Sequence, residues 1–79
     1  MIKVYGTKTC DDCIRTKKLF ADYNVPYEFI DIAISEEATK FVEDANKGAF
    51  QTPVLVLENG EILIEPSNQI LIEKLRLKK

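Results

Sequence analysis

The chain has 79 residues, of which 46% are hydrophobic, and it carries a formal net charge of −2 with no histidine. This length predicts one domain over residues 1–79, whose folding buries about 60% of the surface that the unfolded chain exposes. The charge gives no basic surface for nucleic acid, and no apolar run has membrane-spanning length. Because the N-terminus lacks the basic-then-apolar pattern of a secretory signal, we expect a cytoplasmic protein.

The first third of the chain predicts a strand followed by a helix. Residues 2–5 are rich in strand-forming residues, and this strand ends at Gly6. Asp11 and Asp12 suit the first turn of a helix, and Asn24 can end it. Apolar side chains recur along one face of this helix: Cys13, Ile14, Leu19, Phe20 and Tyr23.

The middle of the chain predicts a second strand and a second helix. Pro26 opens a strand over residues 27–32, which contain aromatic and β-branched residues. Ser35 is a suitable N-cap for the helix that follows, and Gly48 stops that helix. Its apolar positions recur at helical spacing: Ala38, Phe41, Val42 and Ala45.

The last third predicts a hairpin and a final helix. Asn59-Gly60 is a strong hairpin signal between strands at residues 54–57 and 62–64, and Ser67 can cap the helix that follows. The apolar face of this helix contains Ile70, Leu71 and Leu75. The order β-α-β-α-β-β-α indicates an α/β protein with a four-stranded mixed sheet. The first two strands are parallel because a helix connects them, and the hairpin forms an antiparallel edge.

The chemistry of the chain lies in its only two cysteines, Cys10 and Cys13, at the start of the first helix. A helix N-terminus stabilises a thiolate, so Cys10, at the outer end, is the expected nucleophile. It would attack a substrate disulfide, and Cys13 would then attack Cys10 and release the reduced product. Lys8 adds positive charge nearby. The alternative is that the pair is a structural disulfide or has no redox role.

Metal binding is a weaker interpretation of the same cysteines. Tetrahedral zinc needs four ligands, and one chain offers two thiolates and no imidazole. A dimer with four cysteines, or two cysteines with an external thiol, could hold zinc or an iron–sulfur cluster. We therefore expect no metal site within the single chain.

Asp11 and Asp12 lie between the two cysteines. Their negative charges disfavour a neighbouring thiolate and partly offset the helix-end effect, although they also stabilise the helix start. We therefore expect a weaker oxidant than a centre with an uncharged pair at these positions.

Thr52 and Pro53 precede the third strand. Proline lacks a backbone N–H group and therefore suits a strand start. If the bond between them is cis, the N–H and C=O of Thr52 remain free to bind an extended thiol-bearing peptide beside Cys10. Aromatic residues near such a groove are more often part of the core. Three aromatic residues could line the groove or belong to the core: Tyr5, Tyr27 and Phe50.

The chain resembles the glutaredoxin family, above all its short glutaredoxin-like, mycoredoxin-like and NrdH-like members. The resemblance is carried by residues 4–13 (VYGTKTCDDC), 27–32 (YEFIDI) and 51–54 (QTPV), and it extends over essentially the whole chain. It implies a thioredoxin fold with three helices flanking the sheet, with Cys10 as nucleophile and Cys13 as resolving thiol. It also implies that Pro53 is a cis-proline, and that low-molecular-weight thiol or small protein disulfides are substrates.

Three positions depart from the family pattern. The usual Pro-Tyr between the cysteines is Asp11-Asp12, and the lysine usual three residues before the nucleophile is replaced by Thr7, with Lys8 one position later. The Gly-Gly and acidic cap that receive the γ-glutamyl end of glutathione are replaced by residues 65–68 (EPSN). The substrate-binding residues expected from this comparison are Lys8, Thr52, Pro53 and Ser67.

The leading hypothesis is a monomeric dithiol oxidoreductase that reduces protein or small-molecule disulfides and binds neither nucleic acid nor membrane. We expect no tightly bound cofactor, with glutathione or an analogous thiol as co-substrate. The alternative within this class is an electron donor to ribonucleotide reductase, recharged by a thioredoxin-type reductase. Two hypotheses lie outside the class of oxidoreductases: a dimeric iron–sulfur or metal carrier, and a redox-inert adaptor.

Overall fold

The predicted order of elements is present in the structure, a computed structural model that describes residues 1–48 and 51–78. Three α-helices flank a four-stranded sheet in the thioredoxin fold, and a short 3₁₀ helix is added after the second strand. The elements are β1 (Ile2–Gly6), α1 (Asp11–Asp22), β2 (Tyr27–Asp31), η1 (Ile32–Ile34), α2 (Glu36–Ala45), β3 (Val54–Val56), β4 (Ile62–Ile64) and α3 (Asn68–Leu75).

The sheet has the strand order β2-β1-β3-β4. β1 runs parallel to β2, and β3 is antiparallel to both β1 and β4, which confirms the predicted mixed sheet with an antiparallel hairpin. Tyr5 lies opposite Val54, so the end of β1 and the beginning of β3 meet at one edge of the sheet. This register brings the segment after β1 close to the segment before β3.

Local sequence signals mark the starts of α2 and α3 and the end of α2, as expected. The Ser35 and Ser67 hydroxyls accept hydrogen bonds from the backbone N–H groups of Ala38 (3.2 Å) and Ile70 (3.1 Å), so both serines are N-caps. After α2, Gly48 has a φ of 98°, a conformation that glycine adopts at little cost. These caps satisfy backbone groups that the helix itself cannot pair.

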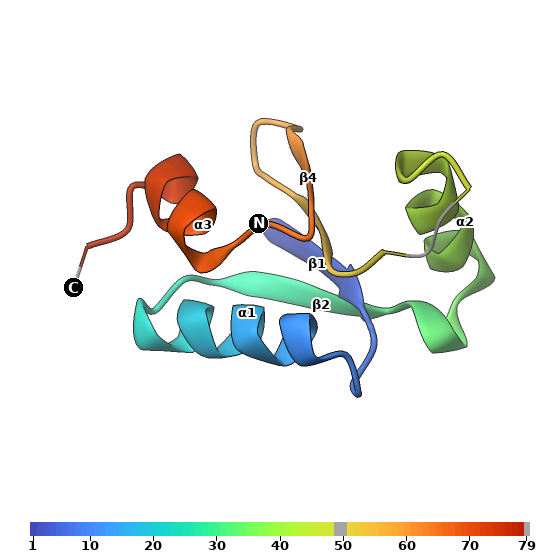
Figure 1. The fold of residues 1–79 in the computed structure, drawn as a ribbon, viewed down its shortest axis with the longest axis horizontal. Coiled ribbons are helices and arrows are strands. Elements are labelled where there is room, and N and C mark those ends of the chain that lie inside the picture. The colour runs from blue at the N-terminus through green and yellow to red at the C-terminus, as the bar shows by residue number, and fades with distance from the viewer. Residues whose placement is uncertain (49–50, 79) are drawn as a thin grey trace.

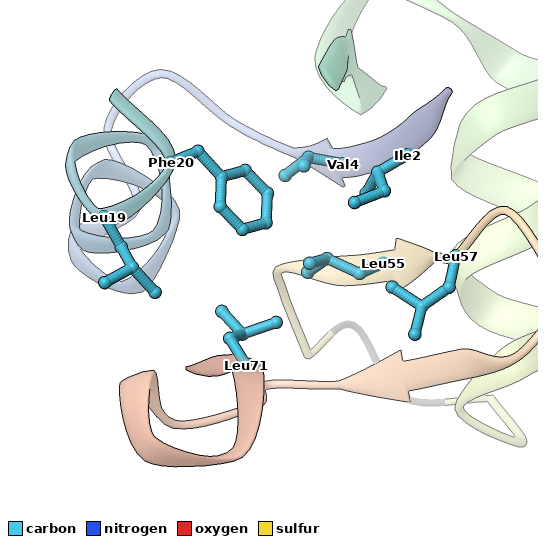
Figure 2. Packing of buried hydrophobic residues seen from close by; sticks show 7 residues of the cluster. All are labelled: Ile2, Val4, Leu19, Phe20, Leu55, Leu57 and Leu71. Atoms are coloured by element: carbon cyan, nitrogen blue, oxygen red, sulfur yellow. The ribbon is translucent and has the colours of Figure 1, made fainter. Parts of the chain in front are cut away.

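Helices cover both faces of the sheet. On one face, α1 and α3 pack against the inward side chains of β1 and β3; α2 packs on the other face, around Val42 and Val54. Figure 1 shows α2 and α3 at opposite ends of the molecule, with α1 running along β2. In Figure 2, Phe20 and Leu71 point from their helices toward Val4 and Leu55 of the strands.

Two residues predicted on apolar helix faces are exposed instead. Ile14 of α1 is 50% exposed and Ile70 of α3 is 43% exposed. In α1 the inner position belongs to Thr16, which is fully buried and whose hydroxyl is satisfied by donating to the backbone C=O of Asp12 at 2.8 Å. In α3, Ile72 packs against the core in place of Ile70. A polar residue satisfied within its own helix is invisible to a count of apolar positions.

The second strand is one residue shorter than predicted. It ends at Asp31, whose carboxylate accepts a hydrogen bond from the Ala33 N–H at 2.9 Å and turns the chain into η1. Such a local side-chain bond offers the backbone an alternative to the strand ladder. β3 is likewise shorter, ending at Val56 rather than at residue 57.

Two of the three aromatic residues considered for a groove, Tyr5 and Tyr27, pack against other rings of the fold. Tyr5 stacks on Phe41 with ring centroids 4.6 Å apart, and Tyr27 lies against Phe20 at 5.4 Å. Phe50 lies outside the described residues.

The contrast between Phe20 and Ile14 gives a stability prediction for α1. Phe20→Ala removes a fully buried ring and should lower the free energy of unfolding by about 3–5 kcal/mol. Ile14→Ala, the matched control on the exposed face, should change it by about 0.5 kcal/mol or less. Urea unfolding of both variants measures this difference, and a large loss for Ile14→Ala would show that this residue belongs to the core.

Candidate active site

Cys10 is the N-cap of α1. Its backbone is extended (φ −76°, ψ 119°), its C=O accepts from the Ile14 N–H at 3.0 Å, and its Sγ accepts from the Cys13 N–H at 3.4 Å. The sulfur therefore occupies the place that a serine or aspartate oxygen takes in ordinary caps. A negative charge at this place is stabilised by the free N–H groups of the first helical turn.

Thr52 also contacts the same sulfur. Its hydroxyl lies 3.3 Å from Cys10 Sγ and can donate to it, while the protonated thiol can donate to the Thr52 C=O at 3.7 Å. The Thr52–Pro53 peptide bond is cis, as the family resemblance implied. Although 42 positions separate the two residues, the pairing of β1 with β3 brings them together.

Cys13 lies one turn inside the helix and is fully buried, whereas Cys10 is partly exposed; both are free thiols. The Cys13 side chain packs against Gly6 at the end of β1, and the Thr7 backbone is hydrogen-bonded to it. One thiol of the pair is therefore reachable from solvent and the other is enclosed between helix and strand.

These surroundings separate the pKa values of the two thiols. Burial alone raises the pKa of Cys10, but hydrogen bonds from Thr52, Cys13 and the Asp12 backbone outweigh it, and the net pKa is lowered. Burial is also the largest cause at Cys13, followed by its hydrogen bond to Cys10, and together they raise the pKa of Cys13 to about 11. As the pH rises, the pair therefore loses its first proton at Cys10, while Cys13 keeps its proton to a higher pH.

The other predicted substrate-binding residues are placed differently. Pro53 is buried beside the site, and its C=O accepts from the Glu65 N–H at 2.9 Å. Lys8 is exposed in the turn before Cys10, and Ser67 is engaged as the cap of α3. Within residues 1–48 and 51–78, neither Lys8 nor Ser67 has a hydrogen bond or ion pair with Cys10.

Arg15 is a site neighbour that the sequence analysis missed. Its guanidinium donates to the Pro66 C=O at 3.0 Å and to the Asn68 amide oxygen, and it lies 3.5 Å from the Asp12 carboxylate. It therefore ties the first turns of α1 to the segment that leads into α3. A basic residue on an exposed helix gives no sign of such a partner 51 or 53 positions away.

The acidic pair between the cysteines points into solvent. Asp11 and Asp12 are both exposed, and the Asp12 carboxylate is paired with Arg15. The Asp12 backbone contributes one of the hydrogen bonds that lower the pKa of Cys10, so this residue supports the thiolate through its main chain. That the pair makes the centre a weaker oxidant stays a prediction.

Residues 1–48 and 51–78 contain neither a candidate metal cluster nor a candidate membrane span. In that part of the chain, no group of three or more His, Cys, Asp or Glu side chains is arranged to hold a metal ion. Nor does it contain a helix with the length and apolar character needed to cross a membrane.

The sequence model of the family described as Glutaredoxin matches residues 2–63, which include both cysteines and the Thr52–Pro53 segment. The chain belongs to the glutaredoxin family. A search of curated proteins gives no match.

Solved structures resemble this glutaredoxin over nearly its whole length. A mutant of the thioredoxin-like protein BC3987 has a TM-score of 0.84 and 25% identity, with 98% of this chain and 96% of that one covered. A glutaredoxin from Archaeoglobus fulgidus has a TM-score of 0.74 and 26% identity, with coverage of 95% and 85%. NrdH-redoxin from Escherichia coli shares the fold, with a TM-score of 0.78, 20% identity and coverage of 99% and 97%.

The Thr52 hydroxyl gives a direct test of the electrostatics at Cys10. Thr52→Val keeps the shape of the side chain but removes the donor to the sulfur, so the pKa of Cys10 should rise. The pH dependence of iodoacetamide alkylation measures this pKa. Thr39→Val is the matched control, because the Thr39 hydroxyl bonds to the Ile32 and Ser35 C=O groups and, within the described part of the chain, to neither cysteine. An unchanged alkylation profile for Thr52→Val would contradict the role given to this hydroxyl.

Proposed function

We propose that this glutaredoxin is a thiol–disulfide oxidoreductase that works by a dithiol mechanism. The observation that carries the proposal is the division between an accessible Cys10 with a lowered pKa and a buried Cys13 whose pKa is raised to about 11. A nucleophile must be ionised and reachable, whereas a resolving thiol must be close and can remain protonated until it is needed.

The reaction has two exchange steps. The Cys10 thiolate attacks one sulfur of a substrate disulfide, so that a Cys10–substrate bond forms, the substrate disulfide breaks, and the first thiolate leaves and is protonated. Cys13 then loses its proton to solvent and attacks Cys10 Sγ, which forms the intramolecular disulfide and releases the second substrate thiolate. The substrate gains two electrons and the cysteine pair loses them.

Thr52 supports binding of the substrate chain next to the attacking sulfur. No partner for its backbone N–H is present among residues 1–48 and 51–78, and its C=O faces Cys10. An extended segment beside a substrate cysteine can pair with these two backbone groups, as a peptide strand pairs with free backbone groups at the edge of a sheet. This mode of binding favours protein disulfides as well as small ones.

The source of electrons divides the proposal into two forms. A buckwheat glutaredoxin has been crystallised with glutathione, and a low-molecular-weight thiol of this kind is the first candidate reductant. The second candidate is a thioredoxin-type reductase, as for an electron donor to ribonucleotide reductase. Arg15 favours the second form. Its guanidinium is hydrogen-bonded to the Pro66 C=O and the Asn68 side chain, in the segment where other members of the family bind the γ-glutamyl group of glutathione, so these groups already have a partner.

Two cysteine variants test the mechanism. Cys10→Ser should reduce the rate of disulfide reduction to the uncatalysed background, and Cys13→Ser should accumulate a mixed disulfide at Cys10 that mass spectrometry identifies. Ile34→Ser, on a residue that is 85% exposed and outside the site, is the control and should retain full activity. Reduction that persists in Cys10→Ser would refute the proposal.

The same assay separates the two electron sources. Oxidation of NADPH is followed with glutathione and glutathione reductase in one series and with thioredoxin reductase in the other. Turnover in only one series identifies the electron source. A separate observation, a bound iron–sulfur chromophore in anaerobically purified protein, would favour a carrier function instead.

A further inference from the structure

Gly6 is the last residue of β1 and lies on the face of the sheet that α1 covers. Ile2 and Val4, which alternate with it along the strand, belong to the core beneath α1 and α3. The glycines of this chain that need a left-handed backbone are Gly48 and Gly60, at φ of 98° and 89°. Gly6 has no such φ, so a need for conformational freedom does not explain a glycine here.

Space explains it. A Cβ built on Gly6 would overlap Cys13 Sγ, far inside any normal nonbonded contact. Its other neighbours, Cys13 Cβ at 3.4 Å and Phe29 Cε1 at 3.7 Å, would tolerate a methyl group. The Cys13 sulfur therefore fills the volume that a side chain at position 6 would otherwise take.

We propose that Gly6 is the positioning residue of the resolving step, because it gives the Cys13 sulfur a place under the end of β1 from which it reaches Cys10. The inference rests on the proposed dithiol function and adds a third residue to it. Gly6 touches no substrate atom and acts only through Cys13.

A side chain at position 6 would affect the two exchange steps to different degrees. The first step uses the Cys10 thiolate and the groups that bond to it, namely Thr52 and the start of α1. The second step needs Cys13 Sγ in line with the Cys10–substrate bond, so that one S–S bond forms as the other breaks. A methyl group at position 6 turns the Cys13 side chain away from its present position. The second step uses this sulfur as the attacking atom, whereas the first step involves it only through one of several hydrogen bonds to Cys10, so the second step is affected far more.

Gly6→Ala tests this division in a single turnover with an excess of a small disulfide, quenched in acid and analysed by mass spectrometry. We expect the mixed disulfide at Cys10 to form at a rate within about twofold of the unmodified protein. Its resolution should slow by roughly tenfold or more, since misplacement by an ångström can cost up to about a hundredfold. The mixed disulfide should then accumulate.

Gly60→Ala is the matched control for loss of stability. It strains a left-handed glycine, yet a Cβ there meets no atom within 4 Å, so both rates should stay unchanged. Resolution as fast in Gly6→Ala as in the unmodified protein would overturn the inference. If the unmodified protein forms no mixed disulfide at all, it is the proposed function that fails.

A double-mutant cycle examines the contact without reference to activity. Gly6→Ala should lower the midpoint of urea unfolding in the reduced protein, and it should do so much less in a Cys13→Ala background, where the overlapping sulfur is gone. An equal loss in both backgrounds would contradict the inference, because the added methyl group would then clash with something other than Cys13.

Discussion

The hydrogen bonds that converge on Cys10 Sγ are the interaction on which the rest depends. One set comes from the first turn of α1 and the other from Thr52, immediately before β3. The bond from α1 is local, but Thr52 reaches the sulfur only because the antiparallel pairing of β1 and β3 places the end of one strand beside the start of the other. The sheet therefore holds the start of a helix and the start of a strand next to the same sulfur atom.

The two cysteines are inequivalent because the same helix turn presents them to different surroundings. Cys10 stays partly exposed among hydrogen-bond donors, while Cys13 faces inward against a strand that has no side chain at Gly6. Charge on the first sulfur is thus stabilised and charge on the second is disfavoured. Arg15 secures the neighbouring segment at Pro66 and Asn68, so the surroundings of the site are held by tertiary contacts as well as by the helix.

Local patterns in the sequence were enough to predict much of this arrangement. The caps at Ser35 and Ser67 and the hairpin around Asn59-Gly60 are decided within a few residues, and the structure confirms them. Features that depend on distant residues were wrong or missed. Ile14 and Thr16 exchange roles because a hydroxyl bonded within the helix can be buried, and the space at Gly6 matters only once α1 lies over β1. The Arg15 contacts span more than 50 positions and have no local signature.

The most direct test of the account is a pH titration of both cysteine Cβ signals by NMR in the reduced protein. The account predicts two separate transitions, with the pKa of Cys10 below that of an ordinary thiol and the pKa of Cys13 at about 11. Two coincident transitions at the ordinary value, or a lower pKa at Cys13 than at Cys10, would contradict it.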